Sequence, residues 1–275
     1  MSYPARHPGT PSVGRMARSA RRTTVPVPRA VDYRPAGHYD GSAGASERLV
    51  CAMEDDDPRC LRPGEARTLL AGLPWRRAVV LSGQEGRLAR GAVVPGYRPR
   101  VWPDRVARAL REARPGLACL LVQARRELVL AEVRSRQLAQ ALAFRADLAL
   151  IACGGPDVRA RRFDADAVET ELSRILASLK EAECRHTVVV SPFDWSASGQ
   201  LTPAQRDRVR SRQRLLVERL TIVTLRHGAL HIDLMGQPDT DPGTLWSPQP
   251  GRLNSRGHAL AAALVVRTLA ARLAP

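Results

Sequence analysis

The chain has 275 residues, of which 44% are hydrophobic, and it carries a formal net charge of +16 at pH 7. This length and hydrophobic content are enough to bury a substantial core in one domain. The sequence contains no stretch of about 20 apolar residues and no basic start followed by an apolar run of about 7 to 15 residues. We therefore expect no membrane span and no secretory signal, and we predict a cytoplasmic protein.

Residues 1–60 form a basic N-terminal segment. Residues 1 to about 45 mix Pro, Gly, Ser, Thr and Arg without a helical or alternating apolar period, so they cannot bury enough apolar surface to offset the entropy lost on ordering. We therefore predict a disordered N-terminal segment, followed by an α/β domain over residues 61–275.

From Leu61 onward, candidate strands and helices alternate, as in a doubly wound parallel sheet. Strands are expected at Ala78–Leu81, Leu117–Val122, Asp147–Ala152, Thr187–Val190 and Ala229–Leu234. The clearest helical spacing is at Val101–Ala113, Ala165–Leu179, Pro203–Leu220 and Ser255–Leu273. A capping box from Thr202 to Gln205 supports the third of these helices, and Asn254 or Ser255 can cap the fourth. The predicted fold is a three-layer α/β/α, flavodoxin-like doubly wound sheet of about five parallel strands.

The third predicted strand runs into a Gly-Gly turn, Gly154–Gly155. Glycine lets the backbone approach a ligand closely, and open α/β sheets bind ligands at the carboxyl ends of their strands. In the SGNH/GDSL hydrolase family this block reads Gly-Gly-Asn-Asp. Segments that begin at Leu61, Gly96 and Leu253 also resemble bacterial members of that family, over about 200 residues in all. The resemblance implies the family's fold and, as an expectation, ester or acyl hydrolysis by a serine nucleophile.

The positions that carry this chemistry in the family hold other residues here. By the resemblance, the nucleophile position falls on Gln84, or on Glu85 when the block is aligned from Gly96, and the Asp and His positions fall on Gln249 and Arg252. The positions equivalent to the family's pocket and oxyanion site are Gly83, Ala124, Gly155 and Pro156.

These substitutions remove the groups that a serine hydrolase requires. The amide of Gln84 neither titrates nor acts as a useful nucleophile. An arginine, whose pKa lies far above neutral pH, keeps its proton there and cannot serve as the general base. Pro156 has neither a side-chain donor nor a backbone N–H. We therefore predict a non-catalytic or strongly impaired family member, a pseudoenzyme that binds an unidentified small molecule or protein.

Two alternatives remain open at this point. In the first, the protein is an active esterase or acylhydrolase with a displaced nucleophile, Ser82, and with His258 as a candidate base; His258 is equally explained as a packing residue at the start of the last helix. In the second, the arginine surplus binds nucleic acid or an acidic partner. Because Lys180 is the only lysine and the arginines are dispersed, a high-GC coding bias also explains the surplus, and we expect weak, non-specific attraction to nucleic acid.

The remaining polar and aromatic residues near the expected site have less specific interpretations. His227, His231 and Asp233 are expected to be structural, and Phe193 and Trp195 either form a pocket wall or pack against the sheet edge. Arg252 offers a guanidinium group that can pair with an anionic ligand. No metal or cofactor is indicated, because the cysteines have neither CxxC nor metal-ligand spacing and are expected to be free thiols: Cys51, Cys60, Cys119, Cys153 and Cys184.

Overall fold

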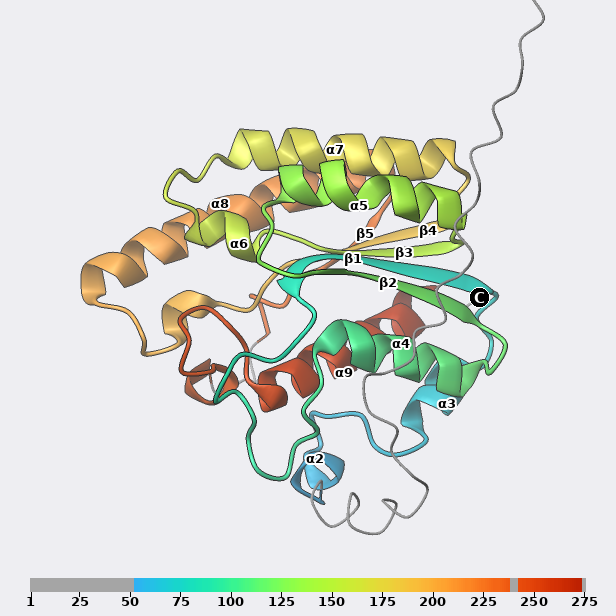
Figure 1. Ribbon diagram of the computed structural model, residues 1–275, viewed down its shortest axis with the longest axis horizontal. Coiled ribbons are helices and arrows are strands. Elements are labelled where there is room, and N and C mark those ends of the chain that lie inside the picture. The colour runs from blue at the N-terminus through green and yellow to red at the C-terminus, as the bar shows by residue number, and fades with distance from the viewer. Residues whose placement is uncertain (1–51, 238–241, 274–275) are drawn as a thin grey trace, which may run out of the picture. The chain divides into compact units, whose positions relative to one another are not determined.

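The structure is a computed structural model that describes residues 52–237 and 242–273. Within these residues, five parallel strands form one sheet in the order β2-β1-β3-β4-β5 (Figure 1). The predicted flavodoxin-like α/β fold is confirmed. The strands are β1 (Arg77–Glu85), β2 (Ala118–Ala124), β3 (Leu148–Ala152), β4 (His186–Val190) and β5 (Leu230–Ile232).

Helices cover both faces of the sheet, which is why β3 consists only of buried apolar residues. On one face lie α4 (Trp102–Ala113) and α9 (Ser255–Leu273); on the other lie α5 (Leu130–Phe144), α7 (Ala165–Glu181) and α8 (Pro203–His227) (Figure 1). The shorter elements are α2 (Ala52–Asp56), α3 (Glu65–Leu69), α6 (Gly155–Arg159) and the 3₁₀ helices η1 (Trp195–Ala197) and η2 (Pro242–Leu245).

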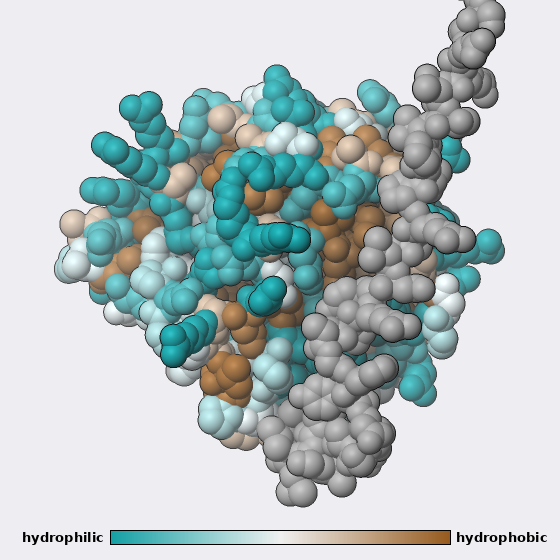
Figure 2. Space-filling view, viewed as in Figure 1, coloured by the Kyte–Doolittle hydropathy of each residue, from teal (hydrophilic) through white to brown (hydrophobic). Residues whose placement is uncertain are grey.

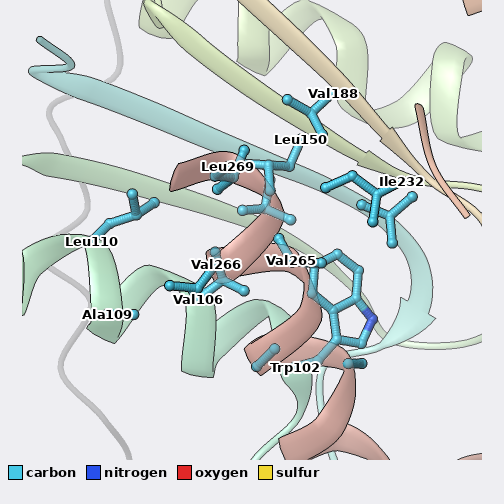
Figure 3. Close-up of a cluster of buried hydrophobic side chains, with 14 of the residues drawn as sticks. Trp102, Val106, Ala109, Leu110, Leu150, Val188, Ile232, Val265, Val266 and Leu269 are labelled. Atoms are coloured by element: carbon cyan, nitrogen blue, oxygen red, sulfur yellow. The ribbon is translucent and has the colours of Figure 1, made fainter. Parts of the chain in front are cut away.

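Figure 3 shows the core between the sheet and the layer formed by α4 and α9. Large side chains from both helices pack against the strands there, and the labelled members are Trp102, Val106, Ala109, Leu110, Leu150, Val188, Ile232, Val265, Val266 and Leu269. Burying each large aliphatic side chain contributes about 1.5–3 kcal/mol. This packing fixes α9, and therefore also the loop before it, which brings Arg252 to the carboxyl edge of the sheet.

Several element boundaries differ from those expected. β1 continues beyond Leu81 because Ser82 still pairs with Ala152 and Glu85 pairs with Ala124. β5 is shorter than the expected strand, and α8 continues to His227, where a left-handed glycine ends it. The capping box at the start of α8 is confirmed. The spacing of apolar residues did not predict α5, because a polar residue, Gln137, occupies one of the buried positions of this helix.

Residues 52–60 pack against the α/β unit. Glu54 of α2 is 5% exposed, and its carboxylate lies 3.0 Å from the guanidinium of Arg98 and 2.6 Å from that of Arg105. Asp57 accepts a hydrogen bond from the Tyr97 hydroxyl at 3.0 Å. The ordered contacts thus begin before Leu61. Residues 1–51 lie outside the described residues, so their disorder stays a prediction.

None of the helices within the described ranges combines the length and apolar character needed to cross a bilayer.

Candidate functional site at the carboxyl edge of the sheet

Several polar residues singled out in the sequence, among them Gln84, Glu85 and Arg252, lie near the switch point of the strand order, where β1 and β3 are neighbours. One cavity of about 40 Å³ lies there, and its lining includes Gln84, Gly155, Pro156, Ser191, Phe193 and Trp195. A second, of about 30 Å³, is lined by residues that include Gln84, Glu85, Glu127, Arg159, Arg252 and His258. A single water needs roughly 10–15 Å³, whereas small-molecule pockets span about 300–1,000 Å³. Both cavities are therefore much smaller than an ordinary small-molecule pocket.

The end of β1 holds Ser82 inside the sheet. Its backbone N–H donates to the side-chain oxygen of Gln137 at 3.0 Å, and its carbonyl accepts from the side-chain nitrogen of Gln137 at 2.8 Å. The Ser82 hydroxyl accepts the N–H of Gln84 at 3.1 Å, and the residue is only 4% exposed. Ser82 is thus a buried strand residue and does not lie on an accessible loop.

Gly83 is required by the close approach of another backbone segment. A Cβ at this position would lie 2.2 Å from the carbonyl oxygen of Leu128, whose N–H donates to the Gly83 carbonyl at 2.8 Å. Ala124, which the resemblance aligns with an oxyanion-site glycine, ends β2, and its carbonyl accepts the N–H of Gly86 at 3.3 Å. Gly83 therefore joins the end of β1 to the loop between β2 and α5, and Ala124 joins the end of β2 to the residue that follows β1.

The Gly-Gly turn after β3 begins α6. Gly154 has φ +86° and precedes the helix, and Gly155 and Pro156 form its first turn. Proline fits there because the first-turn N–H groups have no partner within the helix. The carboxylate of Asp157 accepts the N–H of Leu130 at 3.0 Å, and burial raises its pKa. Pro156 offers no hydrogen-bond donor to the crevice.

Four charged side chains from four separate segments alternate in sign across the crevice: Glu85, Arg252, Glu127 and Arg159. We call them the charge ladder. Arg252 donates to both carboxylate oxygens of Glu85, at 3.1 and 3.2 Å, and its Nε lies 3.4 Å from Glu127. Arg159 pairs with the same Glu127 oxygen and donates to the Gly251 carbonyl at 2.8 Å. The hydrogen bonds from Arg252 lower the pKa of Glu85, and Glu85 raises the pKa of Arg252.

Gln249, which the resemblance aligns with the family's Asp position, is an exposed residue of the loop before α9. Its backbone N–H donates to the Ser247 hydroxyl at 3.2 Å, and its carbonyl accepts the N–H of Arg252, also at 3.2 Å. The structure therefore places Gln249 beside Arg252 through the backbone of a tight turn.

His258 lies in the first turn of α9 and is 7% exposed. Its Nδ1 accepts the backbone N–H of Trp102 at 3.2 Å. Burial, and secondarily the nearby charge of Arg105, lowers the pKa of His258 to about 3. The ring is consequently neutral near pH 7. Because a neutral imidazole carries one proton and Nδ1 is the acceptor, that proton is on Nε2.

The carboxyl ends of β4 and β5 complete the edge. The Ser191 hydroxyl donates to Asp233 at 2.9 Å, and Asp233 also accepts the N–H of Met235 at 2.9 Å. Gln213 of α8 fastens the loop after β4: its side-chain nitrogen donates to the Phe193 carbonyl at 2.8 Å, and its side-chain oxygen accepts the Trp195 N–H at 3.1 Å. Phe193 and Trp195 line the larger cavity, and Phe193 is also part of the core.

The other sequence candidates lie away from the crevice or are enclosed. His227 contacts the Ser173 hydroxyl at 2.8 Å, and His231 contacts Thr221 at 3.1 Å. Cys153 is a free, buried thiol whose pKa is raised well above its ordinary value by burial.

Sequence reasoning singled out neither Glu127 nor Arg159, although both lie in the crevice. The usable signal was Arg252 itself, since a guanidinium in a confined site needs carboxylate partners. Glu85 was considered only as an alternative position for the nucleophile, and the structure brings it to Arg252 as the partner of an ion pair.

Comparison with known proteins connects this geometry to a family. The sequence model of the GDSL-like Lipase/Acylhydrolase family matches residues 85–260, more than half of the chain. The chain belongs to this family. The match within this GDSL-like protein begins at Glu85, just after Ser82–Gln84, and it includes Gln249 and Arg252.

Solved structures of low sequence identity share the fold. A lipase/acylhydrolase from Enterococcus faecalis is 18% identical, with a TM-score of 0.53, and the match covers 72% of this chain and 96% of that one. LAE5, an alpha/beta hydrolase enzyme from the metagenome of Lake Arreo, is 16% identical (TM-score 0.54; 70% and 96% covered). The acetylxylan esterase Axe2 from Geobacillus stearothermophilus is 15% identical (TM-score 0.52; 70% and 93% covered). Comparison with curated protein sequences gives no match.

Proposed function

We propose that this GDSL-like protein is a pseudoenzyme that keeps the scaffold of an ester or acyl hydrolase and binds a partner or ligand without hydrolysing it. The bidentate pair between Arg252 and Glu85 carries the proposal. A general base has to be unprotonated near neutral pH. Glu85 raises the pKa of Arg252 above an already high value, so this guanidinium retains its proton.

The groups nearest to the expected nucleophile position support the same conclusion. Gln84 presents an amide, and the Ser82 hydroxyl is buried against the Gln84 N–H. The Ser191 hydroxyl already donates its proton to Asp233, and this serine is 1% exposed. Neither of these two contacts gives a hydroxyl the unprotonated imidazole that activates a serine.

The alternative mechanism, with Ser82 as nucleophile and His258 as base, meets a chemical obstacle at His258. The lone pair of Nδ1 is used by the Trp102 N–H, and Nε2 holds the ring's single proton. An imidazole in this tautomer has no free lone pair with which to accept a proton from a hydroxyl. The pKa of about 3 also makes it a weak base.

The oxyanion site is altered as well. A serine hydrolase stabilises the developing negative charge with preorganised hydrogen-bond donors, and loss of one such donor costs about 10²–10³ in turnover. Pro156, which stands where the family has Asn, supplies no donor to the crevice. The charge ladder also links the segments around the smaller cavity to one another.

An esterase assay on the purified full chain tests the proposal. We expect no turnover of short p-nitrophenyl esters above the buffer rate and no labelling by a fluorophosphonate. Ser82→Ala is the diagnostic variant, and Ser135→Ala, a change at an exposed serine of α5, is its matched control. Turnover that Ser82→Ala abolishes and Ser135→Ala leaves intact would establish the displaced nucleophile and overturn the pseudoenzyme.

A triple variant supplies the converse experiment. Gln84→Ser, Gln249→Asp and Arg252→His together return the family's nucleophile, acid and base to their aligned positions. Measurable hydrolysis in this variant would show that the scaffold stayed competent and that these three side chains account for the loss. Continued inactivity would assign the block to the unchanged features of the crevice: Glu85, Pro156 and the small cavities.

A further inference from the structure

A strongly positive surface beside the crevice is formed by α6, the loop that follows it, and the first half of α8. Residues 159–164 and 203–214 are 18 residues in all and contain eight arginines and two acidic residues, Asp164 and Asp207. The difference, eight minus two, is +6, more than a third of the chain's net charge of +16. We call these two segments the α6–α8 arginine surface. Figure 2 shows hydrophilic side chains over the part of this face where Figure 1 places α6 and the following loop.

Arg212 holds the two segments together. Its guanidinium donates to the carbonyls of Val158 and Ala160 at 2.9 and 2.8 Å, and it lies 5.7 Å from the ring centre of Phe163. Arg208 precedes Arg212 by one helical turn on the same side of α8. The charges of the loop and of the helix therefore belong to one surface.

Most of these charges are not neutralised by neighbouring acids. Arg159 belongs to the charge ladder. Arg212 donates to backbone carbonyls, and Arg210 donates to the Ser196 hydroxyl. Asp164 is engaged at the start of α7, where it accepts the Ala167 N–H at 2.9 Å. Five guanidinium groups of this surface are exposed and, within the described residues, make no side-chain hydrogen bond or ion pair: Arg161, Arg162, Arg206, Arg208 and Arg214.

The chemistry of the surface selects its partner. A protein interface needs an apolar centre, and a helix that binds a lipid surface inserts apolar side chains. The large exposed apolar residues among the described positions lie outside this surface, with Leu215 at its border: Met53, Val93, Leu215, Ile222 and Leu225. A second copy of this cationic chain would be repelled. Guanidinium groups match phosphate oxygens, and a phosphate backbone is bound by spaced cations alone.

We infer that the α6–α8 arginine surface binds nucleic acid through the phosphate backbone, without reading the bases. This function is separate from the fate of the crevice, because the five exposed arginines contact none of the residues at the family's catalytic positions. The inference also assigns to one surface the attraction to nucleic acid that the sequence predicts from its surplus of arginine.

Fluorescence anisotropy with a short labelled DNA duplex and the full chain tests this inference. The diagnostic variant is Arg161→Ala/Arg162→Ala/Arg208→Ala. Its control, Arg76→Ala/Lys180→Ala/Arg185→Ala, removes three exposed cations near the opposite, amino edge of the sheet. Each phosphate contact makes affinity fall about 3.5-fold between roughly 50 and 200 mM salt. After the loss of three contacts, the total fall in affinity over this range should be about 40-fold smaller than in the parent. The control should keep the parent's salt dependence.

Several outcomes would overturn the inference. Equal losses in the two triple variants would assign binding to overall charge, and affinity that salt leaves unchanged would exclude phosphate contacts. Preference for one duplex sequence over its scrambled version would contradict binding through the backbone alone. Poly-glutamate or anionic phospholipid vesicles that bind as tightly as DNA, and lose binding in the diagnostic variant, would identify an acidic protein or a membrane surface instead. Unfolding midpoints in urea verify that each variant is folded.

Discussion

The charge ladder makes a quantitative prediction about the pair between Glu85 and Arg252. The side chains are 33% and 25% exposed, and two parallel hydrogen bonds join them. Exposed ion pairs contribute about 0.2–1 kcal/mol, and hydrogen bonds to charged groups contribute about 1.5–3 kcal/mol. The intermediate burial places the coupling free energy of this pair at about 1–2 kcal/mol, since solvent screens it only in part.

A double-mutant cycle of Glu85→Gln and Arg252→Gln, followed by urea unfolding, measures this coupling. The folded state lowers the pKa of Glu85 below its ordinary 4.5. The stabilisation is therefore fully present above pH 4.5 and is lost as the pH falls through the lower, folded-state pKa. The control pair is Arg219 with Asp166, whose carboxylate side chain is 79% exposed, and it should couple by less than about 0.5 kcal/mol. Equal coupling in the two pairs, or coupling that grows in acid, would refute the reasoning.

Two further predictions concern the neighbouring backbone and ring. Burial lowers the pKa of His258 from 6.5 to about 3, so its neutral form stabilises the fold above pH 6.5, and this contribution is lost as the pH falls toward 3. The urea midpoint of His258→Asn should therefore fall less steeply over that pH range than the midpoint of the parent. An unchanged pH profile would contradict a lowered pKa of His258. Gly83→Ala places a Cβ 2.2 Å from a carbonyl oxygen and should destabilise the fold by more than about 2 kcal/mol. The control is Gly116→Ala, whose Cβ would have no atom within 4 Å, and it should change the stability by less than about 0.5 kcal/mol. Similar midpoints for the two alanine variants would mean that the backbone yields at Gly83.

The sequence predicted the strands well where burial on both faces demands an apolar run, as at Leu148–Ile151. It failed at the end of β1, because Ser82 and Gly83 are not typical strand residues. Their extended conformation follows from pairing with β3 and from the two hydrogen bonds of Gln137, a residue far away in the chain. The helix that carries Gln137 was missed for the same reason: the polar side chain that stabilises β1 interrupts the apolar period of α5.

At the site, the positions could be found from the sequence but their partners could not. The resemblance to the family singled out Gln84, Pro156 and Arg252, and the structure places these residues in the lining of two neighbouring cavities. The ion pair joins Arg252 to Glu85 across 167 positions of sequence, and no motif places Glu127 and Arg159 beside it. Such contacts depend on how the sheet brings four loops to one edge, which local spacing does not encode.

The Glu85–Arg252 pair also determines how the crevice should respond to a partial reversal. Arg252→His alone puts an imidazole beside the Glu85 carboxylate, which favours the charged ring and raises its pKa above the ordinary value of about 6.5. The new ring would then stabilise the fold below pH 6.5, and this contribution would be lost as the pH rises through the raised pKa. Titration by NMR should show the raised pKa, and adding Glu85→Gln should return it toward the ordinary value.

An imidazole in Arg252→His that titrates equally with and without Glu85 would mean that the carboxylate does not reach it. In that case the charge ladder would not determine the protonation state of the side chain at position 252. If the pKa does respond to Glu85, Arg252→His alone supplies a ring that is more protonated near neutral pH than a free imidazole. Because Gln84 still stands at the predicted nucleophile position, we expect no hydrolysis from Arg252→His alone.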